Sequence, residues 1–461
     1  MVGPMAATEL VVVSNRGPLS WSEDPSGKLV ARRGGGGLVS GLAPLVEGTS
    51  TLWLAAAMSE ADRRAALEVS DAHGFRTRLV AVPTEQYSMA YDVISNATLW
   101  FLYHGLFDLT RRPLFGRRWW EAWSAYRQVN QAFAQATAET ASQGATVLVQ
   151  DYHLALVPAM LHELRSDLAI GHFSHTPFPE PGECAILPDE VRAELLGSMA
   201  ASRACGFHDR RWAARFEACC IEEGLERPQT FVAPLGPDEA ALASEASSDA
   251  SVGAGGTLDE LIAGRKVVLR VDRIEPSKNL LRGMLAIDEL LERRPELATE
   301  IVVVALAYPS RDSLASYMAY RAELETLVDR LNAKWSTSSG RLVELLAQDD
   351  YPRSLAALRR YDVLLVNPVR DGLNLVAKEG PLLNDKDGVV VLSRQAGAWP
   401  ELQKGALGVN PFDITNTAGA LEAALEMPGP ERRRRSEALR SAARTHNPRT
   451  WLDAQLRAVG A

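Results

Sequence analysis

Residues 363–379 read VLLVNPVRDGLNLVAKE, which joins an apolar run, a glycine turn and a helix-like segment. The run Val363–Val366 is apolar on both faces, as expected for a parallel strand covered by helices on each side. Gly372 permits a sharp turn, after which a helix can begin. We interpret the stretch as strand, turn and helix, with Asp371 and Glu379 eight residues apart across it. Ligands of doubly wound sheets bind at such strand ends.

Similar apolar runs rich in β-branched residues alternate with longer amphipathic segments along the whole chain. The predicted strands are Leu10–Val13, Ala145–Gln150, Lys266–Val271, Ile301–Ala305, Val363–Val366 and Gly388–Ser393. The clearest amphipathic helix between them is Ser313–Trp335. This alternation predicts an α/β fold with two doubly wound, Rossmann-like parallel sheets.

The length of 461 residues favours two domains. A composition rich in Ala, Ser and Gly, without a strand pattern, marks residues 237–259 as a linker or exposed elaboration. The predicted parts are a first domain at 1–236, a second domain at 260–435, and a C-terminal segment at 436–461. We expect the helix of that last segment to pack back on the first domain.

Composition and charge exclude several classes of protein. Hydrophobic residues make up 46% and charged residues 23%, which is ordinary for a globular protein. Lys and Arg number 49 against 58 Asp and Glu, and the resulting charge of −9 argues against a general nucleic-acid binder. The chain has no apolar run of about 18 residues, and its N-terminus does not resemble a signal peptide. No membrane span is expected.

Four cysteines are too few for a disulfide framework, and they lack the paired CxxC spacing of a structural zinc site. They are Cys184, Cys205, Cys219 and Cys220. Reduced thiols of this kind are typical of a cytoplasmic protein, which is the predicted location.

Three polar residues that follow predicted strands in the first half are candidates for a ligand site. Arg16 could clamp a phosphate, Asp151 could bind a sugar hydroxyl or act as a base, and His175 could contact a substrate. Each has a structural alternative, namely a surface arginine, a helix N-cap and a core histidine. Gly34–Gly37 precede a helix start, where backbone amides can approach a diphosphate, although a flexible loop is equally compatible.

In the second half, Arg273 and Lys278 frame a turn after the strand Lys266–Val271. Cations beside a helix start suit a leaving diphosphate, with solvated surface charge as the alternative. Asp371 and Glu379 could hold the hydroxyls of a sugar and of a ribose. The alternative is an N-capped helix carrying a surface glutamate.

The chain resembles the trehalose-6-phosphate synthase family, which are retaining glycosyltransferases of family 20 with the GT-B fold. The matching segments occur in the family's order and include VVVSNR, YDVISNATLW, QDYHL, HFSHTPFPEP, VDRIEPSK, PSRDS and RDGLNLVAKE. The resemblance implies two Rossmann-like domains facing a central cleft, with a C-terminal helix that crosses back. It also implies transfer of glucose from a nucleoside-diphosphate glucose to glucose 6-phosphate, giving α,α-trehalose 6-phosphate.

The resemblance carries roles to individual residues. Those expected at the acceptor are Arg16, Tyr91, Trp100, Asp151 and Arg311, with the two arginines on its phosphate. Those expected at the donor are Gly36, Gly37, Arg273, Lys278, Asp371, Gly372, Asn374, Leu375 and Glu379. The catalytic set is expected to be Arg273, Lys278, Asp371 and His175, where His175 resembles the family histidine near the donor sugar.

The expected chemistry is a same-face transfer in which cations stabilise the departing phosphate. A phosphate oxygen of the leaving group takes the acceptor's proton, so neither a metal ion nor another cofactor is expected. Closure of the two domains would exclude water. Asp385-Lys386-Asp387 matches the DxD pattern of metal-dependent glycosyltransferases, but it precedes a strand instead of following one, and we interpret it as a solvated loop.

Two departures from the family pattern bear on the substrates. Leu54–Met58 replaces a Gly-Trp pair that helps line the family's acceptor site. Asp349 and Asp350 stand near the expected base pocket, where the family has a phenylalanine. An aspartate can accept two hydrogen bonds from guanine, whereas uracil has one comparable donor, so we hypothesise GDP-glucose in preference to UDP-glucose.

Other functions fit part of the pattern. Glucosylglycerol-phosphate synthases and pseudo-glycosyltransferases share the fold, and the Leu54–Met58 departure keeps them open. A catalytically inactive sugar-phosphate sensor is the alternative from another class. The expected partners are the two sugar substrates, without nucleic acid or membrane, and a homo-oligomer is compatible with the sequence.

Overall fold

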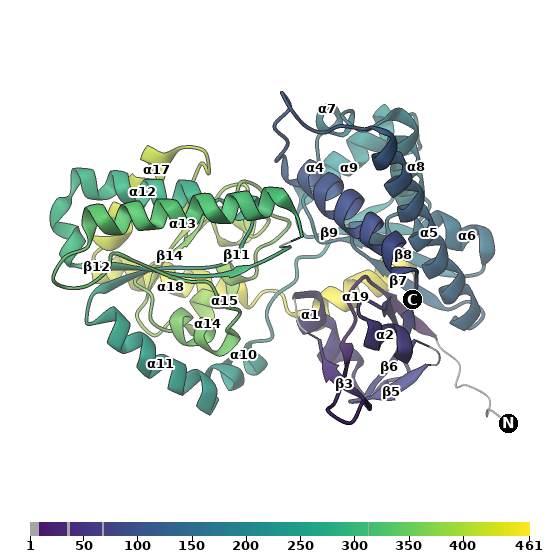
Figure 1. The fold of residues 1–461 in the computed structure, drawn as a ribbon, viewed down its shortest axis with the longest axis horizontal. Helices are drawn as coiled ribbons and strands as arrows, with labels where there is room; N and C mark the ends of the chain where they lie inside the picture. Colours follow the sequence, from purple (N-terminus) through teal and green to yellow (C-terminus); the bar gives the residue numbers. More distant parts are fainter. Residues whose placement is uncertain (1–8, 35–36, 67–68, 312) are drawn as a thin grey trace. The chain divides into compact units, whose positions relative to one another are not determined.

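The computed structural model describes residues 9–34, 37–66, 69–311 and 313–461. The chain divides into two compact units, drawn in Figure 1. Unit 1 contains Met1–Leu235 and Pro448–Ala461, and unit 2 contains Gly236–Asn447. Both are α/β units built on a mainly parallel sheet, which confirms the predicted fold class.

Unit 1 is organised around an eight-stranded sheet in the described part of the chain, parallel except at its β5 edge. In spatial order the strands are β10 (Thr230–Val232), β9 (Ala204–Phe207), β8 (Ala169–Ser174), β7 (Thr146–Gln150), β1 (Leu10–Val13), β4 (Leu52–Ala56), β6 (Phe75–Val80) and β5 (Ser70–Ala72). A separate antiparallel hairpin joins β2 (Leu19–Glu23) and β3 (Leu29–Arg33). The strand order reverses between β1 and β7, which defines the switch point of this sheet.

Helices cover both faces of the unit 1 sheet (Figure 1). They are α1 (Gly37–Val46), α2 (Glu60–Ala65), α3 (Thr84–Ser88), the π-helix η1 (Met89–Leu99), α4 (Trp100–His104), α5 (Arg117–Thr140), the 3₁₀ turn η2 (Tyr152–Leu154), α6 (Val157–Leu164), α7 (Pro181–Cys184), α8 (Asp189–Ala200), α9 (Arg210–Glu222) and α19 (Pro448–Val459). Val11 and Val147 pack with Phe133 of α5 in one buried cluster. The helix α19 contacts β7, β8 and β9.

Unit 2 contains a six-stranded, fully parallel sheet within the described residues. Its spatial order is β13 (Val343–Leu346), β12 (Ile301–Pro309), β11 (Lys266–Ile274), β14 (Val363–Val366), β15 (Val389–Ser393) and β16 (Leu407–Val409). In chain order this is 3-2-1-4-5-6, the Rossmann arrangement, and its switch point lies between β11 and β14.

Helices flank the unit 2 sheet on both sides, with α12 and α13 on one face and α11 and α14 on the other (Figure 1). The helices are α10 (Glu239–Ala246), α11 (Asp249–Ile262), η3 (Pro276–Lys278), α12 (Leu280–Arg293), η4 (Pro295–Thr299), α13 (Ala315–Trp335), α14 (Tyr351–Leu358), α15 (Val376–Leu383), α16 (Trp399–Leu402), α17 (Ile414–Leu425) and α18 (Gly429–Ala443). None of the helices in these ranges is both long and apolar enough to cross a membrane.

Of the two predictions for residues 237–259, an unstructured linker is excluded, because the segment folds into α10 and most of α11 as an elaboration of unit 2. Asp238 caps α10 by accepting bonds from two backbone amides at 3.0 and 3.1 Å, and Ser248 caps α11. Gly255 leaves space for the guanidinium of Arg360, since a Cβ there would lie 2.6 Å from it.

The C-terminal segment also begins later than the predicted residue 436. Helix α18 belongs to unit 2, and the chain joins unit 1 only at Pro448. Leu439 of α18 packs against Gly405 of unit 2, where a Cβ would lie 2.6 Å from its side chain.

Candidate active site

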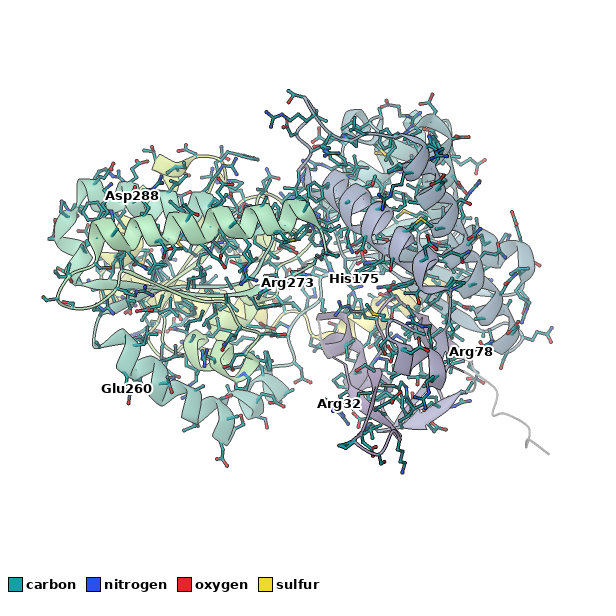
Figure 2. All side chains as sticks on the ribbon, in the orientation of Figure 1. Arg32, Arg78, His175, Glu260, Arg273 and Asp288 are labelled. Atoms are coloured by element: carbon teal, nitrogen blue, oxygen red, sulfur yellow. The ribbon has the colours of Figure 1, made fainter. Side chains whose placement is uncertain are left out.

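The switch point of unit 2 gathers most of the predicted donor residues. Arg273 is on the last part of β11, which runs to Ile274, three residues beyond the predicted strand end. Figure 2 labels Arg273 at this end of the sheet. Lys278 ends the 3₁₀ turn that follows, and Asp371 follows β14 across the switch point. The Lys278 ammonium lies 2.6 Å from a carboxylate oxygen of Asp371, so the two loops are joined by an ion pair.

The loop after β14 is held by Asn374, which stands two residues before the first residue of α15. Its backbone has φ of 80°, which is left-handed and strained for a residue with a side chain. Its side-chain Nδ2 donates to the Asp371 carboxylate at 3.2 Å, and its side-chain Oδ1 accepts from the backbone amide of Ala377 at 3.2 Å. Asn374 therefore caps α15 and orients Asp371 at the same time.

Buried charges support Lys278 from beneath. The guanidinium of Arg270 pairs with Asp272 at 3.0 Å and donates to the backbone carbonyl of Lys278 at 2.9 Å. Burial lowers the pKa of Lys278, but the carboxylates of Asp371, Glu275 and Asp272 outweigh burial and hold that pKa above its usual value. Lys278 is therefore a cation at neutral pH. Gly283 of α12 leaves the space that Arg270 occupies, since a Cβ there would lie 2.0 Å from its guanidinium.

A fully buried carboxylate, Glu275, lies between two predicted phosphate-binding arginines. Its Oε1 is 3.2 Å from a guanidinium nitrogen of Arg273, and its Oε2 is 3.9 Å from one of Arg311. Ser277 donates to Oε1 at 3.0 Å. Arg311 also donates to the hydroxyl of Tyr317 at 2.5 Å, and its backbone is left-handed, with φ of 54°. Asp312 lies outside the described residues.

Two neighbouring residues of α15 face different environments. Lys378 is fully buried and pairs with Glu401 at 2.7 Å. Glu379 is half-buried, and burial raises its pKa to about 7. Near neutral pH this carboxyl is thus divided between its protonated and ionised forms.

The two aspartates near the expected base pocket differ in their bonding and exposure. Asp350 caps α14 by accepting from the Arg353 backbone at 2.9 Å, and it also pairs with the Arg353 side chain at 3.2 Å. Asp349 is exposed after β13. The helix-capping role of Asp350 was not anticipated from the sequence.

In unit 1 the strand end of β1 presents Ser14, Asn15 and Arg16. Ser14 accepts from the indole of Trp53 at 2.7 Å, and Asn15 accepts from the hydroxyl of Tyr87 at 2.9 Å. These buried side chains fix the loop, whereas Arg16 is exposed. Arg311, its expected companion on the acceptor phosphate, belongs to unit 2.

Asp151 begins the other loop at the unit 1 switch point, after β7. Its backbone φ is 71°, and its carboxylate accepts from the backbone of His175 at 3.2 Å. Tyr91 stacks on His153 with ring centres 5.7 Å apart, and His153 Nδ1 lies 3.8 Å from Asp151. Three of the predicted residues thus lie near one strand end, and a strained backbone at such a place points to function.

Tyr91 and Trp100 come from a helix of unusual geometry. Tyr91 is on the eleven-residue π-helix η1, and Trp100 begins α4 directly after it. Trp100 is largely buried and stacks on His104 at 3.9 Å. π-helical turns are frequent at functional sites, but no sequence pattern predicted this one.

A chain of hydrogen bonds holds His175, which Figure 2 labels. The Leu235 amide donates to His208 Nδ1 at 3.3 Å, so the neutral His208 ring carries its proton on Nε2. That nitrogen is 3.1 Å from His175 Nδ1, and His175 Nε2 is 3.0 Å from Gln150 Oε1. Gln150 Nε2 in turn donates to Gln455 Oε1 of α19 at 3.0 Å. Burial lowers the pKa of His175 to about 3, so the ring is neutral.

The Leu54–Met58 departure has a packing reason. Ala55 lies against Gly17, where a Cβ would be 2.7 Å from the alanine methyl. The buried Ala55 methyl therefore occupies the space that Gly17 leaves by lacking a side chain. Of the predicted glycine loop, Gly36 lies outside the described residues, and Gly37 is the first residue of α1.

Glu275 and His208 were not singled out from the sequence. Glu275 stands between the two cations of VDRIEPSK, and that position was its only signal. In the ranges that the structure describes, no group of three or more His, Cys, Asp or Glu side chains could hold a metal ion.

Two Rossmann-like units, with cations gathered at the switch point of the second, are the arrangement of a GT-B glycosyltransferase. The chain belongs to glycosyltransferase family 20, whose family model matches residues 8–460. It is therefore a transferase of the trehalose-phosphate synthase type.

Curated relatives match over nearly the whole chain. The trehalose-6-phosphate synthase of Mycobacterium sp. (strain JLS) is 34% identical over 477 residues, covering 98% of this chain and 96% of the relative. That of Mycobacterium avium (strain 104) is 35% identical, covering 98% and 95%.

Solved structures agree in fold. The E. coli protein bound with UDP-2-fluoro glucose has a TM-score of 0.86 at 27% identity, covering 98% of each chain. A UDP-forming synthase from Burkholderia xenovorans in complex with glucose 6-phosphate has a TM-score of 0.86 at 27% identity, covering 98% of this chain and 100% of that one.

Proposed function

We propose that the enzyme transfers glucose from a nucleoside-diphosphate glucose to glucose 6-phosphate, with retention, to form α,α-trehalose 6-phosphate. The observation that carries the proposal is the group of cations at the carboxyl ends of β11 and β12. Arg273 and Arg311 are held there by the buried carboxylate of Glu275, and Lys278 by the half-buried carboxylate of Asp371. Two phosphate-bearing substrates need such cations, and the relatives in family 20 carry the matching name.

The proposed chemistry follows from what each group can do in the reaction. As the bond from glucose to phosphate breaks, negative charge grows on the departing diphosphate and positive charge on the sugar ring. Arg273 and Lys278 stabilise the phosphate charge, and the amide end of α15 adds a partial positive charge. Asp371 accepts hydrogen bonds from donor hydroxyls, and Glu379 accepts them from the ribose.

The acceptor is proposed to lose its proton to an oxygen of the departing phosphate, on the face from which the phosphate leaves. Same-face attack gives retention without a covalent intermediate, and it needs no side-chain base. His175 is neutral and bonded through both ring nitrogens, so it serves to position groups, and it does not carry charge. We propose that fixed cations take the charge-neutralising role of a divalent metal, so that no metal or other cofactor is required.

At the acceptor, Arg311 is proposed to bind the phosphate, and Asp151 the sugar hydroxyls. The strained backbone of Asp151 and its bond to the His175 amide fix the carboxylate in place. We include Arg16, Tyr91 and Trp100 in the acceptor set on the family pattern. All four cysteines are buried free thiols, which suits the proposed reducing, cytoplasmic location.

For the donor base we propose guanine, as a hypothesis that rests on Asp349. Its carboxylate is exposed near the end of β13, whereas Asp350 is used as a helix cap. The matched Burkholderia synthase is named UDP-forming, so UDP-glucose is the competing donor. Asp349→Ala should lower the ratio of GDP-glucose to UDP-glucose turnover if Asp349 contacts guanine. An unchanged ratio would refute that contact.

The direct test is mass-spectrometric detection of product from a matrix of substrates. UDP-, GDP- and ADP-glucose are each combined with glucose 6-phosphate and with glycerol 3-phosphate. Disaccharide phosphate from glucose 6-phosphate supports the proposal, whereas product from glycerol 3-phosphate alone would favour a glucosylglycerol-phosphate synthase. Absence of product from every pair, with binding of glucose 6-phosphate intact, would favour the inactive sensor.

A further inference from the structure

We infer that Glu275 is a positioning residue that serves both phosphate sites, by holding Arg273 and Arg311 in place with a single buried carboxylate. The inference rests on the proposed function for the roles of the two arginines. Glu275 lies within the matching segment VDRIEPSK, but neither the motif pattern nor the family resemblance assigns it a role. The inference also predicts that loss of the Glu275 charge tightens substrate binding and lowers turnover.

The geometry places Glu275 between the arginines and away from solvent. The carboxylate is fully buried, with one oxygen 3.2 Å from Arg273 and the other 3.9 Å from Arg311. The arginines come from neighbouring strands, since Arg273 is on β11 and Arg311 follows β12. The two oxygens of one carboxylate thus pair with arginines from both strand ends within 4.0 Å.

The local chain holds Glu275 in its own position. Ser277 donates to Oε1 at 3.0 Å, and the Lys278 amide donates to the Glu275 carbonyl at 3.0 Å. The Glu275 amide donates to the Arg273 carbonyl at 2.9 Å. The carboxylate is therefore fixed by the same turn that carries Lys278, and it can act as a rigid anchor for the longer arginine side chains.

The charge of Glu275 has a second consequence for binding. Part of Arg273 is exposed, at 34% of its side chain, so the guanidinium can serve a ligand while Glu275 holds it from behind. Burial lowers the pKa of Arg273, but Glu275, the largest of the opposing effects, together with Tyr308 and Tyr317 holds that pKa above its usual value. The same negative charge must weaken the attraction of both arginines for phosphate. Glu275 thus lowers the affinity for both substrates and fixes the orientation of the two arginines. A fixed orientation favours the transition state over the bound ground state.

The test separates orientation from affinity with Glu275→Gln, which keeps the shape and removes the charge. We expect this variant to bind glucose 6-phosphate, and GDP or UDP, each about tenfold more tightly, because a unit charge at this range has about that effect. We expect kcat to fall by about tenfold or more, since the arginines lose their anchor. A purely structural role would weaken binding and turnover together.

Two further variants keep the result interpretable. Glu275→Asp retains the charge but withdraws the carboxylate, so affinities should stay near the parent values while kcat falls. Ser277→Ala also keeps the charge but removes one bond that fixes the carboxylate, so it should lower kcat and leave both affinities near the parent values, which provides a test of orientation if Glu275→Gln does not fold. The charge-matched control is Glu422→Gln, which pairs with Arg294 at 2.8 Å outside the site and should change neither quantity.

Binding is measured by calorimetry on the whole enzyme with each ligand alone, and turnover by product formation. Weaker binding of both ligands by Glu275→Gln, or tighter binding in the Glu422→Gln control as well, would overturn the inference. If the parent enzyme forms no product from any donor, the proposed function fails. The binding comparison still decides whether Glu275 controls the two phosphate sites.

Discussion

The half-buried carboxyl of Glu379 predicts that donor binding depends on pH near neutrality. Burial raises its pKa to about 7 from an ordinary 4.5. At 1.36 kcal/mol per pH unit, ionising this group in the folded protein costs about 3 kcal/mol more than ionising it in water. The ribose contact requires the ionised form, because only a carboxylate accepts hydrogen bonds from both hydroxyls of a diol.

The sign of the effect follows from this pKa. Below pH 7 the free enzyme must release a proton before the donor binds, so affinity for the sugar nucleotide should rise as pH increases from about 5.5 and level off above about 7.5. The slope approaches tenfold per pH unit at the acidic end. The free energy of unfolding changes in the opposite direction. Between about pH 4.5 and 7 the folded protein holds the Glu379 proton more tightly than the unfolded chain, so stability falls as pH rises through this range. Glu379→Gln should remove that loss.

The assay is calorimetric binding of intact UDP-glucose and GDP-glucose without acceptor, since their diphosphates do not titrate in this range. Measurement in two buffers of different ionisation enthalpy counts the proton released. Glu379→Gln should bind more weakly at pH 8 and show little dependence on pH. A flat profile for the parent enzyme, or an equal slope in the variant, would refute the role of Glu379.

Three further predictions concern single side chains. Lys278→Met should lower kcat by about 10²–10³ through loss of charge stabilisation. The control is Lys334→Met, since Lys334 of α13 is exposed and pairs with Asp288 of α12, and this variant should keep the parent kcat. Equal losses in the two variants would contradict the role of Lys278. Glu401→Gln should destabilise the fold by about 3–5 kcal/mol in chemical denaturation, because it leaves the buried Lys378 ammonium without its carboxylate. The exposed pair of Glu296 with Arg294 is the control, and Glu296→Gln should cost under about 1 kcal/mol; similar costs would refute the difference. His175 should remain neutral from pH 5 to 8 in nitrogen NMR spectra, because its pKa is about 3, and a titration near pH 6.5 would contradict the hydrogen-bonded chain.

The parallel sheets were predictable because their strands are apolar on both faces. The runs at Val363–Val366 and Lys266–Val271 became β14 and part of β11, and polar residues after them meet at the switch point. Charged residues that follow parallel strands must lie at one edge of the sheet, so Lys278 and Asp371 could be expected near each other. Their ion pair depends on the conformation of two loops, which the pattern does not specify.

What the sequence did not show depends on contacts between distant segments. Glycines at 253–256 weaken a helix in isolation, but Gly255 makes room for Arg360, and α11 forms through tertiary packing. The π-helix η1 likewise has no local signature. Asp350 resembles a base-binding carboxylate in sequence, yet it bonds the backbone of its own helix. Glu275 was missed because a buried carboxylate and a surface one look the same in sequence.

The central proposal is a retaining glucosyl transfer to glucose 6-phosphate, and the anomeric configuration of the product tests it most directly. The enzyme is supplied with nucleoside-diphosphate glucose labelled with carbon-13 at C1, together with glucose 6-phosphate, and the product is examined by NMR. The proposed same-face transfer predicts a labelled α-anomeric carbon bonded through oxygen to a second α-anomeric carbon. A β-configured labelled carbon, or labelled free glucose as the sole product, would contradict it.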